Sequence, residues 1–339
     1  MAPARVTATQ VAARAGVSQS AVSRVYTDGA SVSPRMEAKV RKAAAELGYR
    51  PNVLARAMAS GRSRIIGLVV AYLENQFYPD ALEKLSNALQ AEGYHVLVFM
   101  ASQTAGNIDG VVEELLDYQV DGIIAASVAM SSDLSRRCEE AGVPLVLFNR
   151  GVDDLAIPTV SSDNFAGGRA VARFLIDAGH RKIGYIAGWE GASTQRDREA
   201  GFRAGLDAAG VPLFARGVGD FRMDRARAVA LDMCRKDPPD ALFVANDHMA
   251  FAVLDALRSE LGMRVPDDIS VIGYDDVPAA RWPAYDLTTV RQPANQMVAA
   301  TVEILMDRMD DPMGHARQVA IPGPLMVRGS ARLPKDQPQ

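Results

Sequence analysis

Residues 9–26 read TQVAARAGVSQSAVSRVY, and this stretch decides the fold of the N-terminal part of the chain. Val11 and Ala12 begin one apolar helical face, Gly16 interrupts it, and Ser18 is a typical N-cap for a second helix. Two short helices joined by a tight turn that contains glycine form the helix-turn-helix pattern. The stretch therefore predicts a helix-turn-helix.

The second helix of this motif presents polar side chains outward, from Gln19, Ser20, Ser23 and Arg24. Short or forked polar groups of this kind can hydrogen-bond base edges in the major groove of DNA. A helical hairpin without a nucleic-acid partner is the plain structural alternative. The charge disfavours it, because residues 1–64 hold eleven Lys and Arg against three Asp and Glu, a net charge of +8.

The rest of the chain is acidic. The 339 residues hold 37 Lys and Arg and 41 Asp and Glu, a net charge of −4, so residues 65–339 carry −12. A basic head on an acidic body indicates two units with different partners, and the partner of the head is expected to be a polyanion. The length is that of two or three domains with ample buried core.

A third helix is predicted over Pro34–Leu47, between the N-cap Ser33 and the helix-ending Gly48. Residues 51–59 then predict a short helix, followed by a linker at residues 60–63. A helix of about eight residues is not stable alone in water, so DNA or a second copy of the chain would have to hold it. The alternative is that it is simply the last helix of the small domain.

From Ile65 onward, short apolar runs alternate with amphipathic stretches, the rhythm of a parallel α/β sheet. This rhythm occurs twice, over about 65–160 and 163–290. The predicted strands are Ile65–Ala71, His95–Met100, Gly122–Ala126, Leu145–Phe148, Lys182–Ala187, Ala241–Ala245 and Ser270–Gly273. The predicted helices are Ala81–Glu92, Ile108–Tyr118, Asp133–Ala141, Gly167–Ala178, Gln195–Ala209, Ala226–Cys234 and Met249–Leu261.

Polar residues follow several of these strands, among them Asn149 and Arg150, Ser161 to Asp163, Asn246 and Asp247, and Tyr274 to Asp276. Ligands of open α/β sheets bind at the carboxyl ends of the strands, and two facing sheets would enclose a cleft. Carboxylate, amide and guanidinium groups in a cleft suit a polyhydroxylated ligand. Each residue alone could instead be an ordinary helix cap, so the prediction depends on the set.

Several classes of protein are disfavoured. The sequence has no phosphate-binding loop, no nucleophile elbow and no zinc-binding HExxH helix, so neither catalytic residues nor a metal or cofactor is predicted. Two cysteines cannot build a disulfide framework or a four-cysteine zinc site. No apolar run reaches the roughly 18 residues of a membrane span, and no secretory signal begins the chain. We expect a soluble cytoplasmic protein with no membrane partner.

The motifs AGVSQSAVSRV, SVSP, AELGYRPN and LARAM resemble the DNA-binding domain of the lactose/galactose repressor (LacI/GalR) family of bacterial regulators. VSSDN, GHRKIGYIAG, DREAGF, VANDHMA and ISVIGYDD are similar to the effector-binding core of the same family, so the resemblance spans residues 6 to about 330. It implies an all-α helix-turn-helix domain plus a hinge helix, followed by an α/β periplasmic-binding-protein-like core of two parallel-sheet subdomains.

The resemblance also implies site residues. Those expected to contact double-stranded DNA are Thr7, Ser18, Gln19, Ser20, Ser23, Arg24, Asn52, Ala55 and Met58. Met58 stands where the family usually has a leucine that wedges a base step open in the minor groove, and methionine is a softer wedge. Those expected to contact the effector are Phe77 and Tyr78 from the first strand-end loop, together with Asn149, Asp163, Arg198, Phe221, Asn246, Asp275 and Gln292.

The resemblance further implies a domain plan. We expect the helix-turn-helix domain over 1–50, the hinge helix and linker over 51–64, the effector-binding and dimerisation core over 65–330, and a disordered tail over 331–339. Within the core, we expect an N-subdomain of about 65–162 and 293–322 and a C-subdomain of about 163–292 and 323–330, because the family's chain crosses three times between subdomains.

The predicted function is a ligand-responsive transcriptional regulator, a repressor by resemblance. It would bind a pseudo-palindromic operator as a homodimer, with a sugar or sugar acid in the cleft. The tail lacks leucine heptads, which disfavours a tetramer. The alternatives are an α/β sugar-processing enzyme and a solute-binding protein, each with an incidental basic N-terminus.

Overall fold

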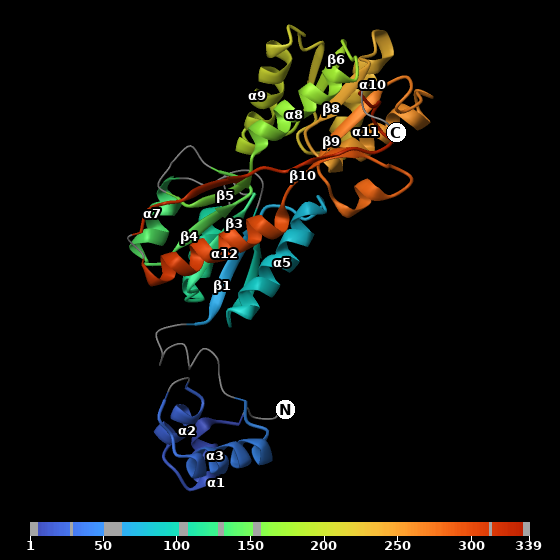
Figure 1. Cartoon of the computed structure of the whole chain (residues 1–339). Coiled ribbons are helices and arrows are strands. Elements are labelled where there is room, and N and C mark those ends of the chain that lie inside the picture. Colours follow the sequence, from blue (N-terminus) through green and yellow to red (C-terminus); the bar gives the residue numbers. More distant parts are fainter. Residues whose placement is uncertain are drawn as a thin grey trace. The chain divides into compact units, whose positions relative to one another are not determined.

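The computed structural model describes residues 6–27, 30–50, 63–101, 108–127, 132–151, 157–311 and 314–334 (Figure 1). The chain divides into two compact units, one made of residues 1–65 with 119–121 and the other of the remaining residues. Within the described ranges, no helix is long and apolar enough to cross a membrane. The predicted hinge contacts Asn52, Ala55 and Met58 lie outside the described residues.

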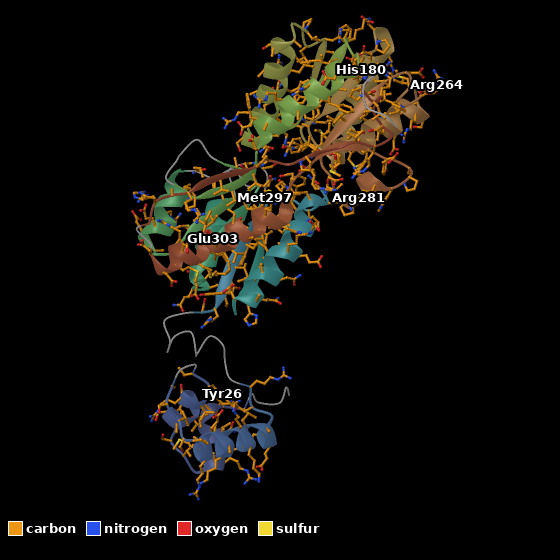
Figure 2. The ribbon with its side chains drawn as sticks, in the orientation of Figure 1. Tyr26, His180, Arg264, Arg281, Met297 and Glu303 are labelled. Carbon is orange, nitrogen blue, oxygen red and sulfur yellow. The ribbon has the colours of Figure 1, made fainter. Side chains whose placement is uncertain are left out.

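The first unit is a helical bundle with the predicted helix-turn-helix. It contains α1 (Ala8–Ala15), α2 (Gln19–Val25) and α3 (Pro34–Leu47). Gly16 ends α1 with φ 66°, a left-handed backbone that glycine adopts at little cost. Val11, Val22 and Val40 are buried together in its small core. At the edge of that core, Tyr26 lies against the ring of Tyr49 and under the guanidinium of Arg41 (Figure 2).

The second unit contains two six-stranded sheets. The first has the order β11-β5-β4-β3-β1-β2 and consists of β1 (Ile65–Val70), β2 (His95–Met100), β3 (Gly122–Ala126), β4 (Leu145–Phe148), β5 (Thr159–Ser162) and β11 (Gln318–Ile321). The second has the order β12-β10-β9-β8-β6-β7 and consists of β6 (Ile183–Ala187), β7 (Ala215–Val218), β8 (Ala241–Val244), β9 (Ser270–Asp275), β10 (Thr288–Arg291) and β12 (Leu325–Met326).

Helices cover both sheets. Those of the first are α5 (Phe77–Ala91), α6 (Ile108–Asp117), α7 (Ser132–Glu140) and α12 (Ala294–Asp310), and α5 and α12 lie side by side (Figure 1). Those of the second are α8 (Asn164–Asp177), α9 (Ser193–Ala208), α10 (Met223–Lys236), α11 (Asp247–Ser259) and the 3₁₀ helix η1 (Pro278–Arg281). The α/β architecture with two mostly parallel sheets is as predicted.

The chain crosses between the sheets three times. It leaves the first sheet after β5, returns through α12 after β10, and crosses again between β11 and β12. The short β12 pairs antiparallel with β10, while β10 pairs parallel with β9. The carboxyl ends of β5, β10 and β11 and the start of α12 therefore belong to the segments that link the two sheets.

The predicted disordered tail begins too early. Ala331 is buried in the core, and the backbone N–H of Arg332 donates to Ser270 Oγ at 3.0 Å. Arg332 also lies 2.9 Å from Nδ1 of His180, which is fully buried. These contacts hold residues 331 and 332 against the second sheet.

Glycines let α8 and α9 approach closely. A Cβ atom on Gly168 would lie 2.1 Å from the carbonyl oxygen of Arg198, and one on Gly201 would lie 1.9 Å from that of Phe165. Neither position can accept a side chain unless one of the helices shifts. The close approach sets the position of Arg198, which α9 carries toward the ends of the strands.

Candidate ligand cleft and nucleic-acid interface

The predicted base-reading residues lie on one exposed helix. Ser18 caps α2, its Oγ accepting from the N–H of Ala21 at 3.2 Å, and it also lies 2.9 Å from Ser20 Oγ. Gln19, Ser23 and Arg24 are exposed. The polar face of α2 is therefore free of the protein core and sits on a helix fixed at its N-terminus.

Thr7, another predicted DNA contact, caps α1. It forms a capping box in which its backbone N–H donates to Gln10 Oε1 at 2.8 Å. Around the motif, the structure gives no ion pair for Arg24, Arg35 or Lys39 in the described part of the helical unit. These exposed cations can contact phosphates, the contacts that position a protein on DNA.

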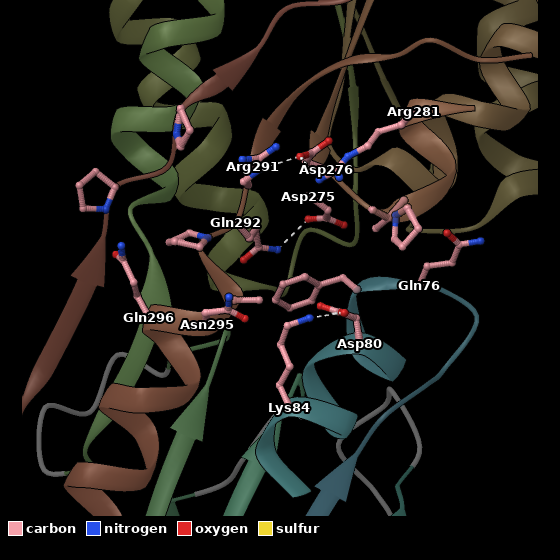
Figure 3. Close-up of a pocket in the computed structure, with 17 residues that line it drawn as sticks. Gln76, Asp80, Lys84, Asp275, Asp276, Arg281, Arg291, Gln292, Asn295 and Gln296 are labelled. Carbon is pink, nitrogen blue, oxygen red and sulfur yellow. Dashed lines mark hydrogen bonds and ion pairs between the residues drawn. The ribbon is translucent and has the colours of Figure 1, made fainter. Parts of the chain in front are cut away.

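In the second unit, a buried network centres on Asp275, the last residue of β9. Its Oδ1 accepts from Gln292 Nε2 at 2.7 Å, and its Oδ2 accepts from Asn75 Nδ2 at 2.8 Å. Arg198 Nη2 lies 3.6 Å from Oδ1. Three residues from distant parts of the chain thus meet on one carboxylate (Figure 3 shows the Gln292 contact).

Arg198 is 2% exposed and is held on every side. Its Nε donates to Asn164 Oδ1 at 2.8 Å, its Nη1 donates to the carbonyl of Ala245 at 2.6 Å, and its guanidinium lies 3.7 Å from the centroid of the Tyr274 ring. Burial raises the pKa of Asp275, while the positive charge of Arg198 lowers it. The predicted effector residues Arg198, Asp275 and Gln292 are therefore close together, as one connected group.

A second group forms on the first sheet. Asn149 follows β4 and donates from Nδ2 to the hydroxyl of Tyr78 at 2.9 Å, and its Oδ1 is buried without a hydrogen-bond partner. Tyr78 also packs against Tyr72, with ring centroids 5.3 Å apart. Phe77 and Tyr78 were predicted on a loop, but they lie in the first turn of α5, where Phe77 stacks on Phe148 in the core.

Two predicted effector residues act as helix caps. Asp163 Oδ1 accepts from the N–H of Ala166 at 2.8 Å at the start of α8, and Asn246 Oδ1 accepts from the N–H of Met249 at 3.0 Å at the start of α11. Phe221 lies over Gly188, where a Cβ would come within 2.2 Å of its ring. None of these three contacts the Asp275 network or Asn149 through a hydrogen bond between described side chains.

Unusual backbone conformations gather at the same strand ends. Ser127, Asn149, Phe221 and Asp275 all have positive φ, which side chains other than glycine adopt at a cost. Such strained residues concentrate at functional sites, where the surrounding fold holds them in place. The conformations agree with a ligand site at the ends of β3, β4 and β9.

A cavity of about 720 Å³ opens beside the Asp275 network (Figure 3). Its walls come from the start of α5, the end of β9, η1 and the start of α12, and it includes Phe77, Asp275 and Gln292. Asp276 lies in its wall and pairs with Arg291 at 2.6 Å, Arg281 at 3.3 Å and Arg328. Asp275 and Asp276 thus bind different partners, although they are neighbours in the sequence.

Asp247, at the start of α11, is a second fully buried carboxylate. It accepts from the Thr289 hydroxyl at 2.6 Å and from the N–H of Val277 at 3.0 Å. Burial and, to a smaller extent, the nearby negative charge of Asp275 raise the pKa of Asp247 to about 8. Among the described residues, no group of three or more His, Cys, Asp or Glu side chains could hold a metal ion.

The sequence reasoning omitted several residues that build the cleft. Asn75, Asn164 and Tyr274 contact the predicted residues Asp275 and Arg198 directly. Asn75 and Asp275 are 200 positions apart, so no local pattern could pair them. Tyr274 and Arg150 were noted as polar residues at strand ends but were not placed in the site. The position of Arg150 next to Asn149 was the available signal.

A helix-turn-helix with an exposed polar recognition helix, followed in one chain by an α/β core with a polar cleft, defines a ligand-responsive DNA-binding regulator. Residues 7–52 match the model of the lacI family of bacterial regulatory proteins, and residues 172–331 match a periplasmic binding protein-like domain. The chain belongs to the LacI family of bacterial transcriptional regulators.

Relatives and solved structures agree along nearly the whole chain. The transcriptional regulator CelR of Thermobifida fusca is 34% identical over 336 residues, which is 96% of this chain and 98% of CelR. The repressor PurR of Photobacterium profundum is 31% identical over 330 residues, 95% of this chain and 97% of PurR. These relatives are regulators and not enzymes.

Two solved structures are similar over the same length. A CelR–cellobiose complex is 32% identical with a TM-score of 0.72 and covers 96% of this chain and 100% of its own. A lac repressor dimer bound to operator and the anti-inducer ONPF is 28% identical with a TM-score of 0.87, covering 96% and 99%.

Proposed function

We propose that this chain is a repressor that binds a pseudo-palindromic operator as a homodimer and is modulated by a sugar or sugar acid in the cleft of its core. It would act in the cytoplasm, where its DNA target lies. The proposal divides the chain as in the sequence analysis, into a DNA-binding domain, a hinge, and a core whose subdomains exchange the segments near 293–322 and 323–330.

The network that joins the two sheets carries this proposal. Asn75, which follows β1 of the first sheet, donates to Asp275 at the end of β9 in the second. Ser162 Oγ at the end of β5 lies 3.2 Å from the hydroxyl of Tyr274. A ligand with several hydroxyls could exchange hydrogen bonds with such groups and so change how the two halves close on each other.

The homologues support a sugar as the effector class. CelR has been solved with cellobiose, and the cleft of this chain offers acceptors that a sugar hydroxyl could use, the Oδ1 of Asn149 and the Oε1 of Gln292. Both oxygens are buried without a hydrogen-bond partner. A buried acceptor left without a donor costs free energy that a ligand hydroxyl would recover.

An exposed apolar edge supports the homodimer. β2 is an edge strand of the first sheet, and its Val98 and Met100 are 43% and 50% exposed. Tyr118, whose ring lies 5.9 Å from that of Phe99, is exposed beside them. Exposed apolar edge strands invite pairing, and we propose that a second copy covers this one, as in the dimer in which lac repressor was solved.

The dimer would couple effector binding to DNA binding. A ligand that changes closure of the cleft would change the spacing of the two DNA-binding domains. If the new spacing cannot seat both on the operator, DNA is released. If the new spacing favours seating, binding tightens. A coupling free energy of about 1–3 kcal/mol is typical of such linked sites.

The direct test combines DNA selection with a ligand screen on the full chain. Genomic fragments enriched by the protein are compared with scrambled competitors by fluorescence anisotropy, with and without sugars and sugar acids. We expect a strong preference for selected fragments and a shift in affinity with at least one ligand. A strictly monomeric protein, or one without preference for any fragment, would refute the proposal.

Two variants separate the parts of the mechanism. Arg198→Ala should retain operator affinity and lose the ligand response, because Arg198 sits in the cleft network. A response of normal size in that variant would remove Arg198 from the ligand site. Met58→Gly should weaken operator binding far more than non-specific binding, and an equal loss on both DNAs would contradict the wedge.

A further inference from the structure

Arg150 is a buried cation to which the described residues offer no carboxylate partner. It directly follows Asn149 at the end of β4 and is only 5% exposed. Its Nε and Nη1 atoms are buried and make no hydrogen bond, and the described residues give it no ion pair. Guanidinium groups that are removed from water ordinarily bind a carboxylate, because the desolvation of the charge is otherwise uncompensated.

The surroundings of Arg150 place it between the two halves of the core. Its guanidinium carbon lies 5.3 Å from the ring centroid of Trp189, which follows β6 of the second sheet. Next to it, the N–H of Gly151 donates to Ser193 Oγ at 3.0 Å, another contact between the two halves. The hydroxyls of Tyr72 and Tyr78 lie close enough to interact with its charge, and so does Arg198.

Among the described residues, the charges around Arg150 and Arg198 leave an excess of positive charge. Arg198 has Asp275 as its counter-ion, and burial raises the pKa of that carboxylate, so it compensates at most one of the two cations. Nothing in the described part of the cleft offers Arg150 a carboxylate. The remaining charge is therefore available to a bound anion.

We propose that Arg150 binds a carboxylate of the effector, which makes the effector an acidic sugar, such as a uronic or aldonic acid, rather than a neutral one. The carboxylate would take two parallel hydrogen bonds from the guanidinium, the geometry that arginine offers to this group. The ring of Trp189 would cover the other side of the cation. This proposal rests on the proposed function and narrows its ligand.

Trp189 provides a direct reporter. The chain has two tryptophans, and the other, Trp282, is exposed, so Trp282→Phe leaves Trp189 as the single fluorophore. Full-length protein with this background is titrated with matched pairs: glucose and glucuronate, galactose and galacturonate, cellobiose and cellobionate. We expect at least one acid to change the Trp189 emission and to bind at least about tenfold more tightly than its neutral partner.

Substitutions then test the role of Arg150. Arg150→Met should remove the preference for the acid, and Arg150→Lys should retain part of it, because lysine keeps the charge but loses the fork. Arg173→Met is the control, since Arg173 is an exposed arginine on α8. In the ligand-free protein, Arg150→Met should leave the thermal midpoint unchanged or raise it, because it removes an uncompensated buried charge.

The proposal would be overturned if no acid bound more tightly than its neutral partner, or if glucose 6-phosphate bound more tightly than every carboxylate. It would also be overturned if the Arg150→Met variant kept the preference for the acid, or if both Arg150 variants had a lower thermal midpoint and still preferred the acid. The proposed function would fail differently. Acids would then bind with the expected preference but would not change the affinity for selected DNA. Neutral sugars that release DNA as well as the acids do would leave the function standing and refute the role of Arg150.

Discussion

Some arginines of the helical unit have no counter-ion in the described structure, whereas the arginines that hold the α/β core together are paired. In the helical unit, Arg24 and Arg35 are exposed, and neither forms an ion pair with a carboxylate of the described residues. In the α/β core, Arg216 pairs with Glu199 at 2.8 Å, and Arg328 lies on the buried Asp276. Arg150 resembles Arg24 and Arg35 in having no carboxylate partner among the described residues, and it resembles the arginines of the core in being buried.

The difference separates structural charges from charges that await a ligand. A paired arginine in the core fixes the position of a strand end or a helix. An exposed unpaired one costs little in water and can neutralise a phosphate when DNA arrives. A buried unpaired one is costly, so it indicates a partner that binds inside the protein. The following predictions test this division by removing charges of each kind.

The largest effect is expected where one carboxylate serves three arginines. The side chain of Asp276 is fully buried and contacts Arg281, Arg291 and Arg328. Asp276→Ala should lower the free energy of unfolding by about 3–5 kcal/mol, since it leaves these cations without a counter-ion. Urea denaturation measures the loss. Asp224→Ala removes an exposed partner of Arg222 and should leave the midpoint unchanged; equal effects would show that burial does not decide the outcome.

A smaller effect is expected from the buried carboxylate that has no arginine. Burial raises the folded-state pKa of Asp247 to about 8, above its ordinary value of 3.8. The unfolded chain then releases this proton first, so Asp247 favours folding below about pH 4 and loses that contribution as the pH rises toward 8. Between pH 5 and pH 7 the expected loss is about 2–3 kcal/mol.

Asp247→Asn tests this pH dependence. An asparagine can accept from the N–H of Val277 and donate to the hydroxyl of Thr289, as a protonated Asp247 would. Its free energy of unfolding should fall less between pH 5 and pH 7 than that of the wild type, in urea titrations at both values. Parallel curves for the two proteins would show that Asp247 is ionised in the folded state throughout.

The next smaller effect is expected for the recognition of the DNA sequence. Arg24→Ala should cost about 1–2 kcal/mol in operator affinity and relax the preference at one base pair, if the side chain contacts a base edge. Lys39→Ala should instead weaken all DNA to a similar degree and flatten the dependence on salt. Anisotropy titrations on selected and scrambled DNA compare the two. A uniform loss for Arg24→Ala would make it a phosphate contact.

The sequence was sufficient to predict the strands that are strongly apolar. The strands β1, β3, β4, β6, β8 and β9 were predicted, because buried central strands read as continuous apolar runs. The edge strand β2 was also predicted, because its residues are apolar although several are exposed. The missed strands were short and lay at or near the sheet edges: β5, β7, β10, β11 and β12. An edge strand needs only one neighbouring strand and can be half exposed, so β11, with alternating exposure, carries an apolar run of only three residues, Val319–Ile321.

The sequence could predict a polar cleft, but it could not predict which residues in the cleft form hydrogen bonds and ion pairs with one another. Polar residues at strand ends predicted a cleft, and Arg198, Asp275 and Gln292 do lie together there. The same rule could not separate ligand contacts from helix caps. The side-chain oxygens of Asp163 and Asn246 are in fact caps, since they accept hydrogen bonds from backbone N–H groups at helix starts. For the same reason, the predicted starts of α8 and α11, at Gly167 and Met249, are too late in the sequence. The polar residues before them belong to the beginnings of these helices.

The smallest effect is expected for the exposed ion pair of the helical unit. Arg14 Nη2 lies 2.7 Å from Glu46 Oε2 and links α1 to α3, with both side chains substantially exposed. Such pairs contribute less than about 0.5–1 kcal/mol, because water and salt screen them. Arg14→Ala should therefore shift the unfolding free energy by less than about 0.5 kcal/mol.

The same variant compares a paired with an unpaired arginine on one small domain. Since Arg14 is engaged with Glu46, its loss should weaken DNA binding less than the loss of Arg24, at equal change in formal charge. Glu46→Ala frees Arg14 and adds one positive charge, so it should strengthen binding slightly at low salt. If Arg14→Ala weakens binding as much as Arg24→Ala, then pairing within the protein does not decide which arginines are available to DNA, and the division between the two kinds of arginine fails.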